Sequence, residues 1–192
     1  MRFASDRSFA EAHRLLGEFL ASPAPRVADG WAQRLAAVLR AGNKVMICGN
    51  GGSMCDAAHF AEELSGRFRA DRPALAAVAC ADPAHITCVA NDYGFEFVFS
   101  RWVEALGRPG DALIVLSTSG KSPNCLRAAA AARERGLLVL GLLGKTGGRL
   151  LDACDEAIIA PGATSDRIQE LHMLVLHTLV EGVEAALGHA AG

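Results

Sequence analysis

Two histidines, a glutamate and a glutamine have the spacing of a proton-transfer or metal site. His59 and Glu63 are four residues apart in a stretch of helical periodicity, so their side chains share one face of the predicted helix. Gln169 and His177 are eight residues apart on a predicted terminal helix, which separates their Cα atoms by about 12 Å along the axis and about 80° around it. Long side chains at these positions can converge, and such nitrogen and oxygen donors suit Zn²⁺ or a similar divalent ion. A solvated acidic helix face and a hydrogen-bonded core histidine are the structural alternatives.

Two loops rich in glycine and hydroxyl groups predict a phosphate site. The first loop, Gly49 to Ser53, joins an apolar run to a helical stretch, so its backbone and a helix N-terminus offer N–H groups to an anion. The second loop, Ser117 to Ser122, follows the apolar run DALIVL and carries several hydroxyl groups. This number of hydroxyl groups suits a phosphate monoester better than a single helix cap. Ligands of open parallel sheets bind beyond the carboxyl ends of the strands, where we expect both loops.

Neither loop matches the two common nucleotide-binding motifs. The dinucleotide fingerprint G-x-G-x-x-G, aligned on Gly49 and Gly51, needs a glycine where this chain has Met54. The P-loop motif that would end at Ser122 needs a glycine where this chain has Val115. The sequence therefore predicts a phosphorylated ligand smaller than a nucleotide.

Strands and helices alternate along most of the chain and position these loops. Apolar runs predict strands at residues 45–48, 75–80, 111–116, 137–143 and 156–160. Helices are predicted at residues 54–64, 83–90, 95–106, 123–135 and 164–187, the last with Ser165 as a candidate N-cap. The alternation is typical of an α/β domain with a parallel sheet and helices on both faces. We expect one domain over residues 1–192, with N-terminal helices in 1–41 and the α/β core in 42–192.

Helices outside the alternating pattern indicate contacts between subunits. Two helices, at residues 3–20 and 27–40, precede the first strand, and their apolar faces pack either on their own domain or on another subunit. The terminal helix is apolar around nearly its whole circumference, through Ile168, Leu171, Leu174, Val175, Leu176, Leu179, Val180 and Val183. Such a helix is buried, and in a chain this small we expect an oligomer interface. Gln169, His172 and His177 interrupt this surface and need partners or a function.

Composition argues against several broad classes of function. The net charge of −2 disfavours a general nucleic-acid or membrane-surface binder. No apolar stretch reaches the roughly 20 residues that a bilayer requires, and the N-terminal sequence lacks a signal-peptide pattern. None of the six cysteines forms a C-x-x-C pair, so we expect free thiols in a reducing cytoplasm rather than a zinc finger or a disulfide framework.

Four motifs together resemble the bacterial phosphoheptose isomerases, that is, the sedoheptulose 7-phosphate isomerases of the sugar-isomerase (SIS) domain superfamily. They are CGNGGSMCDAAHFAEELSGRF at residues 48–68, ANDYGF at 90–95, STSGKS at 117–122 and DRIQELHMLVLH at 166–177. The resemblance implies a three-layer, doubly wound SIS fold with a five-stranded parallel sheet, in a homotetramer with active sites between subunits. It also implies conversion of sedoheptulose 7-phosphate to D-glycero-D-manno-heptose 7-phosphate, the first step towards lipopolysaccharide heptose or nucleotide-activated heptose. The N-terminal 40 residues carry little of the family signature.

The resemblance further implies a role for each matching residue. Glu63 and His177 are the expected acid/base pair, and the expected ligands of one Zn²⁺ per subunit are His59, Glu63, Gln169 and His177. The residues expected to bind phosphate are Ser53, Ser117, Thr118, Ser119 and Ser122. The remaining residues expected to contact the substrate are Asn50, Gly51, Gly52, Arg67, Asp92, Asp166 and Gln169. Met54 stands where some family members have histidine.

Two other functions are compatible with the same phosphate loops. One is that of a non-catalytic SIS-domain regulator that binds the replication initiator DnaA, which shares a serine-rich loop and an RIQE segment. That relative lacks the residues that match Glu63 and His177, and because both are present here the enzyme is favoured. The other is an isomerase or binding protein for a different sugar phosphate, including amino sugars.

Overall fold

A single parallel sheet forms the centre of the molecule in the computed structural model, which describes residues 4–189; Phe3 of the first predicted helix lies outside this range. Among the described residues the strands are β1 (Val45–Gly49), β2 (Ala77–Ala79), β3 (Ala112–Ser117), β4 (Leu138–Gly144) and β5 (Glu156–Ala160). Their spatial order is β2-β1-β3-β4-β5, and every neighbouring pair is parallel. The predicted five-stranded sheet is confirmed, although β2 is shorter than the predicted strand at 75–80.

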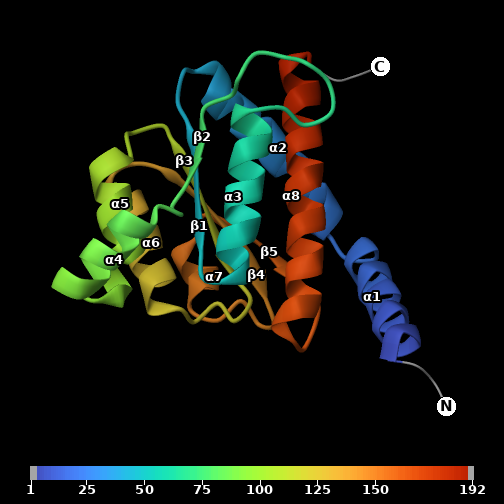
Figure 1. The fold of residues 1–192 in the computed structure, drawn as a ribbon. Helices are drawn as coiled ribbons and strands as arrows, with labels where there is room; N and C mark the ends of the chain where they lie inside the picture. Colours follow the sequence, from blue (N-terminus) through green and yellow to red (C-terminus); the bar gives the residue numbers. More distant parts are fainter. Residues whose placement is uncertain (1–3, 190–192) are drawn as a thin grey trace.

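Helices cover both faces of the sheet, so the predicted three-layer architecture is also confirmed (Figure 1). One face carries α2 (Ala24–Arg40), α3 (Gly52–Ser65) and α8 (Ser165–Leu187), with α1 (Ala4–Leu20) attached to this layer. The other face carries α4 (Pro83–Asp92), the 3-10 turn η1 (Phe95–Phe97), α5 (Val98–Leu106), α6 (Pro123–Glu134) and α7 (Leu150–Ala153). The sequence did not predict the short α7, and it merged η1 with α5.

Alternation along the strands divides the core into two halves. In β1, Val45 and Ile47 pack with α2, α3 and α8, whereas Met46 and Cys48 pack with α5 and α6. All four residues are completely buried. A strand with apolar residues on both faces needs cover on both sides, which explains why this segment is a continuous apolar run rather than an alternating one.

The terminal helix α8 is buried mainly by its own chain. It packs against α2, α3 and the strands β4 and β5, and of the eight apolar residues named for it above, Leu174 is exposed, at 44%. His172 is fully buried, with Nε2 3.0 Å from the Leu143 carbonyl oxygen. The apolar circumference of α8 therefore does not by itself require a second subunit. Within residues 4–189, neither α8 nor any other helix is long and apolar enough to cross a membrane.

In contrast, α1 projects from the body of the molecule and leaves apolar surface uncovered (Figure 1). Leu15 and Phe19 are its buried residues, whereas Phe9 is 77% exposed. A hollow of about 290 Å³ lies between α1, α2 and α8, lined chiefly by apolar side chains that include Leu16, Phe19 and Leu174. The predicted apolar face of this helix is thus only partly covered by the rest of the chain.

Candidate active site

The loop between β1 and α3 is shaped by glycines, one by its backbone conformation and two by the lack of room for a side chain. Gly51 has a φ of +57°, in the region that favours glycine. A Cβ atom on Gly49 would lie 2.8 Å from the Cβ atom of Ser53, and one on Gly52 would lie 2.8 Å from Nε2 of Gln169. The loop therefore brings α3 close to both β3 and α8. Ser53 belongs to the first turn of α3 rather than to the loop itself.

Three helix N-termini meet at one small polar cavity. The cavity has a volume of about 160 Å³ and is lined by Asn50, Ser53, Leu116, Ser117, Thr118, Ser122, Ser165 and Gln169. Ser53, Ser122 and Ser165 stand at the beginnings of α3, α6 and α8. The N-cap residues of α6 and α8, Ser122 and Thr164, make no side-chain capping hydrogen bond. The positive ends of the three helix dipoles favour an anion at this place.

Hydroxyl groups that follow β3 contact the beginnings of α6 and α8. Ser117 Oγ accepts a hydrogen bond from the Gly120 N–H group at 3.1 Å and lies 3.5 Å from Ser122 Oγ. Thr118 Oγ1 lies 3.1 Å from Ser165 Oγ on α8. These hydroxyl groups can reorient towards a bound phosphate because each both donates and accepts hydrogen bonds.

Two residues that the sequence did not assign to the site belong to it, and one of the residues expected to bind phosphate lies outside the cavity. Asn124, which is buried, exchanges hydrogen bonds of 2.9 and 2.7 Å with Asn50 and so fixes that amide. Ser165 lines the cavity as the first residue of α8, so its predicted N-cap role was wrong; Thr164 is the cap. Ser119 does not line the cavity, and its hydroxyl accepts a hydrogen bond from the Lys121 N–H group at 3.2 Å. The polar run STSGKSPN was the available signal for Asn124.

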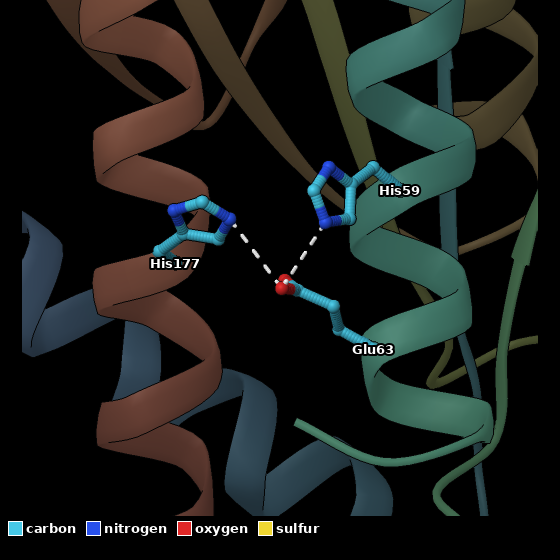
Figure 2. A group of neighbouring side chains, drawn as sticks. All are labelled: His59, Glu63 and His177. Atoms are coloured by element: carbon cyan, nitrogen blue, oxygen red, sulfur yellow. Dashed lines mark ion pairs between the residues drawn. The ribbon is translucent and has the colours of Figure 1, made fainter. Parts of the chain in front are cut away.

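Further along α3, a carboxylate lies between two imidazole rings (Figure 2). Glu63 Oε1 is 3.3 Å from Nε2 of His59, one turn earlier on α3, and 3.4 Å from Nε2 of His177 on the neighbouring helix α8. Ligand atoms of the three residues lie within 4.8 Å of one another. The predicted convergence across two helices is therefore confirmed for three of the four side chains.

Burial controls the electrostatics of this carboxylate. The Glu63 side chain is 8% exposed, and its Oε2 atom is buried without a hydrogen-bond partner among the described residues. Burial raises the pKa of Glu63 above its ordinary value, while the His177 and His59 rings oppose that shift. The Phe68 ring stacks on His177 with centroids 5.9 Å apart. A buried carboxylate beside imidazoles suits proton transfer, and its unpartnered oxygen together with two ring nitrogens also suits a divalent cation.

Gln169 lies at the cavity rather than in the group around Glu63. Its Nε2 atom donates a hydrogen bond to Ser53 Oγ at 3.2 Å, and its amide lies against Gly52. Gln169 was predicted as both a substrate and a zinc ligand, and in this rotamer it has the position of a substrate ligand. A role as metal ligand would require the side chain to turn towards His177.

Three further predicted residues reach neither the cavity nor the Glu63 group within one chain. Arg67 follows the end of α3 and is exposed. Asp92, the last residue of α4, accepts a hydrogen bond from Asn91 Nδ2 at 2.7 Å, and Asp166 pairs with Arg167 at 3.3 Å. Both aspartates are also exposed.

Comparison with known proteins agrees with this geometry. A family model described as "SIS domain" matches residues 9–144. The phosphoheptose isomerase of Fusobacterium nucleatum is 59% identical over 153 residues, which cover 80% of this chain and 79% of that protein. The structure of a phosphoheptose isomerase from Francisella tularensis superposes with a TM-score of 0.90 at 35% identity, covering 94% of this chain and 96% of that one. The corresponding structure from Neisseria gonorrhoeae gives a TM-score of 0.87 at 37% identity, covering 94% and 97% of the two chains. This chain therefore belongs to the phosphoheptose isomerase family of SIS-domain proteins.

Proposed function

We propose that this protein isomerises sedoheptulose 7-phosphate to D-glycero-D-manno-heptose 7-phosphate, the first step in the synthesis of nucleotide-activated heptose. One observation carries the proposal. The same two helices, α3 and α8, begin at an anion-binding cavity and carry a carboxylate between two imidazoles further along. An aldose–ketose isomerase of a phosphorylated sugar needs both features, at opposite ends of its substrate.

The cavity supplies the phosphate site in this proposal. The hydroxyl groups of Ser53, Ser117, Thr118 and Ser122, together with the three helix N-termini, donate hydrogen bonds to the phosphate oxygens. Ser119 can join them only if its hydroxyl turns away from the Lys121 N–H group. Asn50 lines the same space, whereas Gly51 and Gly52, which follow it at the start of α3, do not.

The acid/base group then meets the other end of the open-chain sugar. Ser53 and Glu63 are ten residues apart on α3, a rise of about 15 Å. Side chains on a helix lean towards its N-terminus, so the Glu63 carboxylate reaches back towards the cavity. A sugar with its phosphate in the cavity and its chain along α3 and α8 presents C1 and C2 to Glu63 and His177.

Glu63 and His177 divide the proton transfers between them. Glu63 removes the proton from C1 of the ketose, and the electron pair moves into a C1–C2 double bond to give a cis-enediol(ate). His177 moves a proton between O1 and O2, because an imidazole can donate from one nitrogen and accept on the other. Glu63 then returns its proton to C2, which completes the aldose. Burial makes Glu63 a stronger base than an exposed glutamate, since it disfavours the charged carboxylate.

The donor set around Glu63 also fits a zinc ion. His59, Glu63 and His177 would hold it, and Gln169 would join them after turning from Ser53. When bound, the ion supplies positive charge that polarises the oxygens at C1 and C2 of the substrate. A carboxylate bound to zinc is a weaker base, so the ligand and base roles of Glu63 compete.

We further propose a homotetramer with active sites between subunits. The support is apolar surface that one chain leaves uncovered: it includes Phe9 on α1 and the hollow lined by Leu174. A second subunit would cover this surface. Arg67 and Asp92 reach neither site feature in one chain, as expected for residues that complete the site of a neighbouring copy. All six cysteines are free, which suits the reducing cytoplasm in which we place the enzyme.

A coupled assay with sedoheptulose 7-phosphate tests the proposed reaction. We expect formation of the aldose phosphate, and at most weak turnover of a six-carbon ketose phosphate or an amino-sugar phosphate. Tight binding of the heptose phosphate without any turnover would contradict the catalytic assignment. Preferential turnover of one of the other sugars would contradict the substrate assignment.

A further inference from the structure

A buried ion pair joins the two helices that carry Glu63 and His177. Arg72, in the segment between α3 and β2, donates from Nε to Glu184 Oε1 on α8 at 2.8 Å. The Arg72 side chain is 1% exposed and that of Glu184 6% exposed. A guanidinium so completely removed from water needs a hydrogen-bond acceptor for most of its N–H groups. The N–H groups that do not bond to Glu184 find their acceptors on the protein backbone.

Arg72 also binds the C-terminal end of α3. Its Nη2 donates to the carbonyl oxygen of Glu63 at 2.6 Å, and its Nη1 donates to that of Leu64 at 2.7 Å. The last carbonyl groups of a helix lack partners within the helix and form the negative end of its dipole, so a cation there is favourable. One of these two carbonyls belongs to the residue that supplies the carboxylate of the acid/base pair.

Glu184 stands on the same helix as the other member of the pair. It follows His177 by seven residues on α8, which is nearly two turns and returns to the same face of the helix within about 20°. One guanidinium therefore connects the backbone of Glu63 to the face of α8 that presents His177. The side chains of Glu63 and His177 meet 3.4 Å apart across the same helix pair.

A neighbouring ion pair lacks this arrangement and provides a matched comparison. Arg69, in the same segment, pairs with Glu181 on α8 at 3.0 Å. Their side chains are 60% and 58% exposed, and an exposed pair of this kind has little influence on helix position.

We propose that Arg72 and Glu184 are positioning residues, which fix the separation between the Glu63 carboxylate and the His177 ring and thereby the rate of proton transfer. The inference rests on the proposed function, because it assigns those two side chains to catalysis. Neither Arg72 nor Glu184 lines the cavity at the beginning of α3. Loosening the pair therefore affects the chemical step while phosphate binding is retained.

The test compares turnover with binding in four variants of the full chain. A misplacement of about 1 Å in a catalytic group can cost on the order of 100-fold, so we expect Glu184→Leu and Arg72→Lys to lower kcat about 10- to 100-fold. The dissociation constant of sedoheptulose 7-phosphate, measured by calorimetry, should stay within about twofold, as expected when an interaction serves only the transition state. Glu184→Gln, which keeps an acceptor for Arg72 Nε, should recover most of the lost kcat. Glu181→Leu, the matched control, should behave as the unmodified protein.

The outcomes separate positioning from a merely structural role. An unchanged kcat in folded Arg72→Lys overturns the inference, and so does a parallel loss of kcat and binding. If Glu184→Leu does not fold, Arg72→Lys and Glu184→Gln give the same comparison. A crystal structure of Arg72→Lys adds a readout that needs no activity, since a Glu63–His177 distance still at 3.4 Å also overturns it. Absence of isomerase activity in the unmodified protein contradicts the proposed function instead.

Discussion

Replacement of Ser122 by alanine should weaken the binding of phosphorylated sugars and leave the fold intact. Ser122 occupies the N-cap position of α6, but its side chain makes no capping hydrogen bond. Its hydroxyl lies 3.5 Å from Ser117 Oγ, a distance at which a hydrogen bond is weak. The unliganded protein therefore loses little when this hydroxyl is removed, whereas the liganded protein loses a bond to a charged phosphate oxygen.

The magnitude follows from the charge of the ligand. A hydrogen bond to a charged group contributes about 1.5–3 kcal/mol, which raises the dissociation constant about 10- to 150-fold. Titration calorimetry with sedoheptulose 7-phosphate measures this change, and thermal unfolding measures stability in parallel. Ser65→Ala is the matched control, because Ser65 lies at the opposite end of α3 and its hydroxyl donates to the Ala61 carbonyl oxygen. Unchanged affinity together with a lower melting temperature in Ser122→Ala would refute the assignment and make Ser122 a structural cap.

Three further results follow from the same structure. Burial lowers the pKa of His172 from 6.5 to about 4. As the pH falls, the unfolded chain therefore binds a proton at this histidine before the folded protein does, and the free energy of unfolding should fall by about 3 kcal/mol between pH 6.5 and 4. Denaturant unfolding of His172→Gln should lack this contribution, and an equal loss of stability in both proteins would contradict it. Light scattering should give a tetramer that Phe9→Ser weakens, and a monomer at micromolar concentration would count against shared active sites. Chelator should lower both bound zinc and kcat, and His59→Ala should reduce zinc per subunit; a metal-free protein of full activity would exclude the zinc proposal.

Sequence reasoning succeeded where the signal was local. The apolar run of β1 predicts a strand that is covered on both faces, and the glycines after it predict a tight loop, because only glycine adopts such backbone conformations easily. The spacing of His59 and Glu63 also determined their shared helix face. These features depend on residues within one or two turns of each other, so the sequence contains them directly.

The remaining features depend on how α8 packs against α2 and α3. The apolar circumference of α8 was interpreted as an oligomer interface, but the chain's own helices and strands cover most of it. The rotamer of Gln169 is set by the close approach of Gly52 and by the Ser53 hydroxyl. Arg72 is separated from Glu184 by 112 residues, and nothing in the spacing of charged residues identified this pair.

Exchange of the C1 proton with solvent probes the proposed base itself. Glu63→Gln keeps the shape of the side chain and removes its basicity, so turnover should fall by about 10²–10⁴, the range for lost general acid–base catalysis. Binding should change little, because Glu63 does not line the phosphate cavity. In deuterated water, NMR of bound and released sugar follows deuterium entering at C1. We predict that the unmodified protein exchanges this proton and that Glu63→Gln exchanges it slower by the same factor as its turnover. Exchange by Glu63→Gln at the unmodified rate would contradict the assignment of Glu63 as the base.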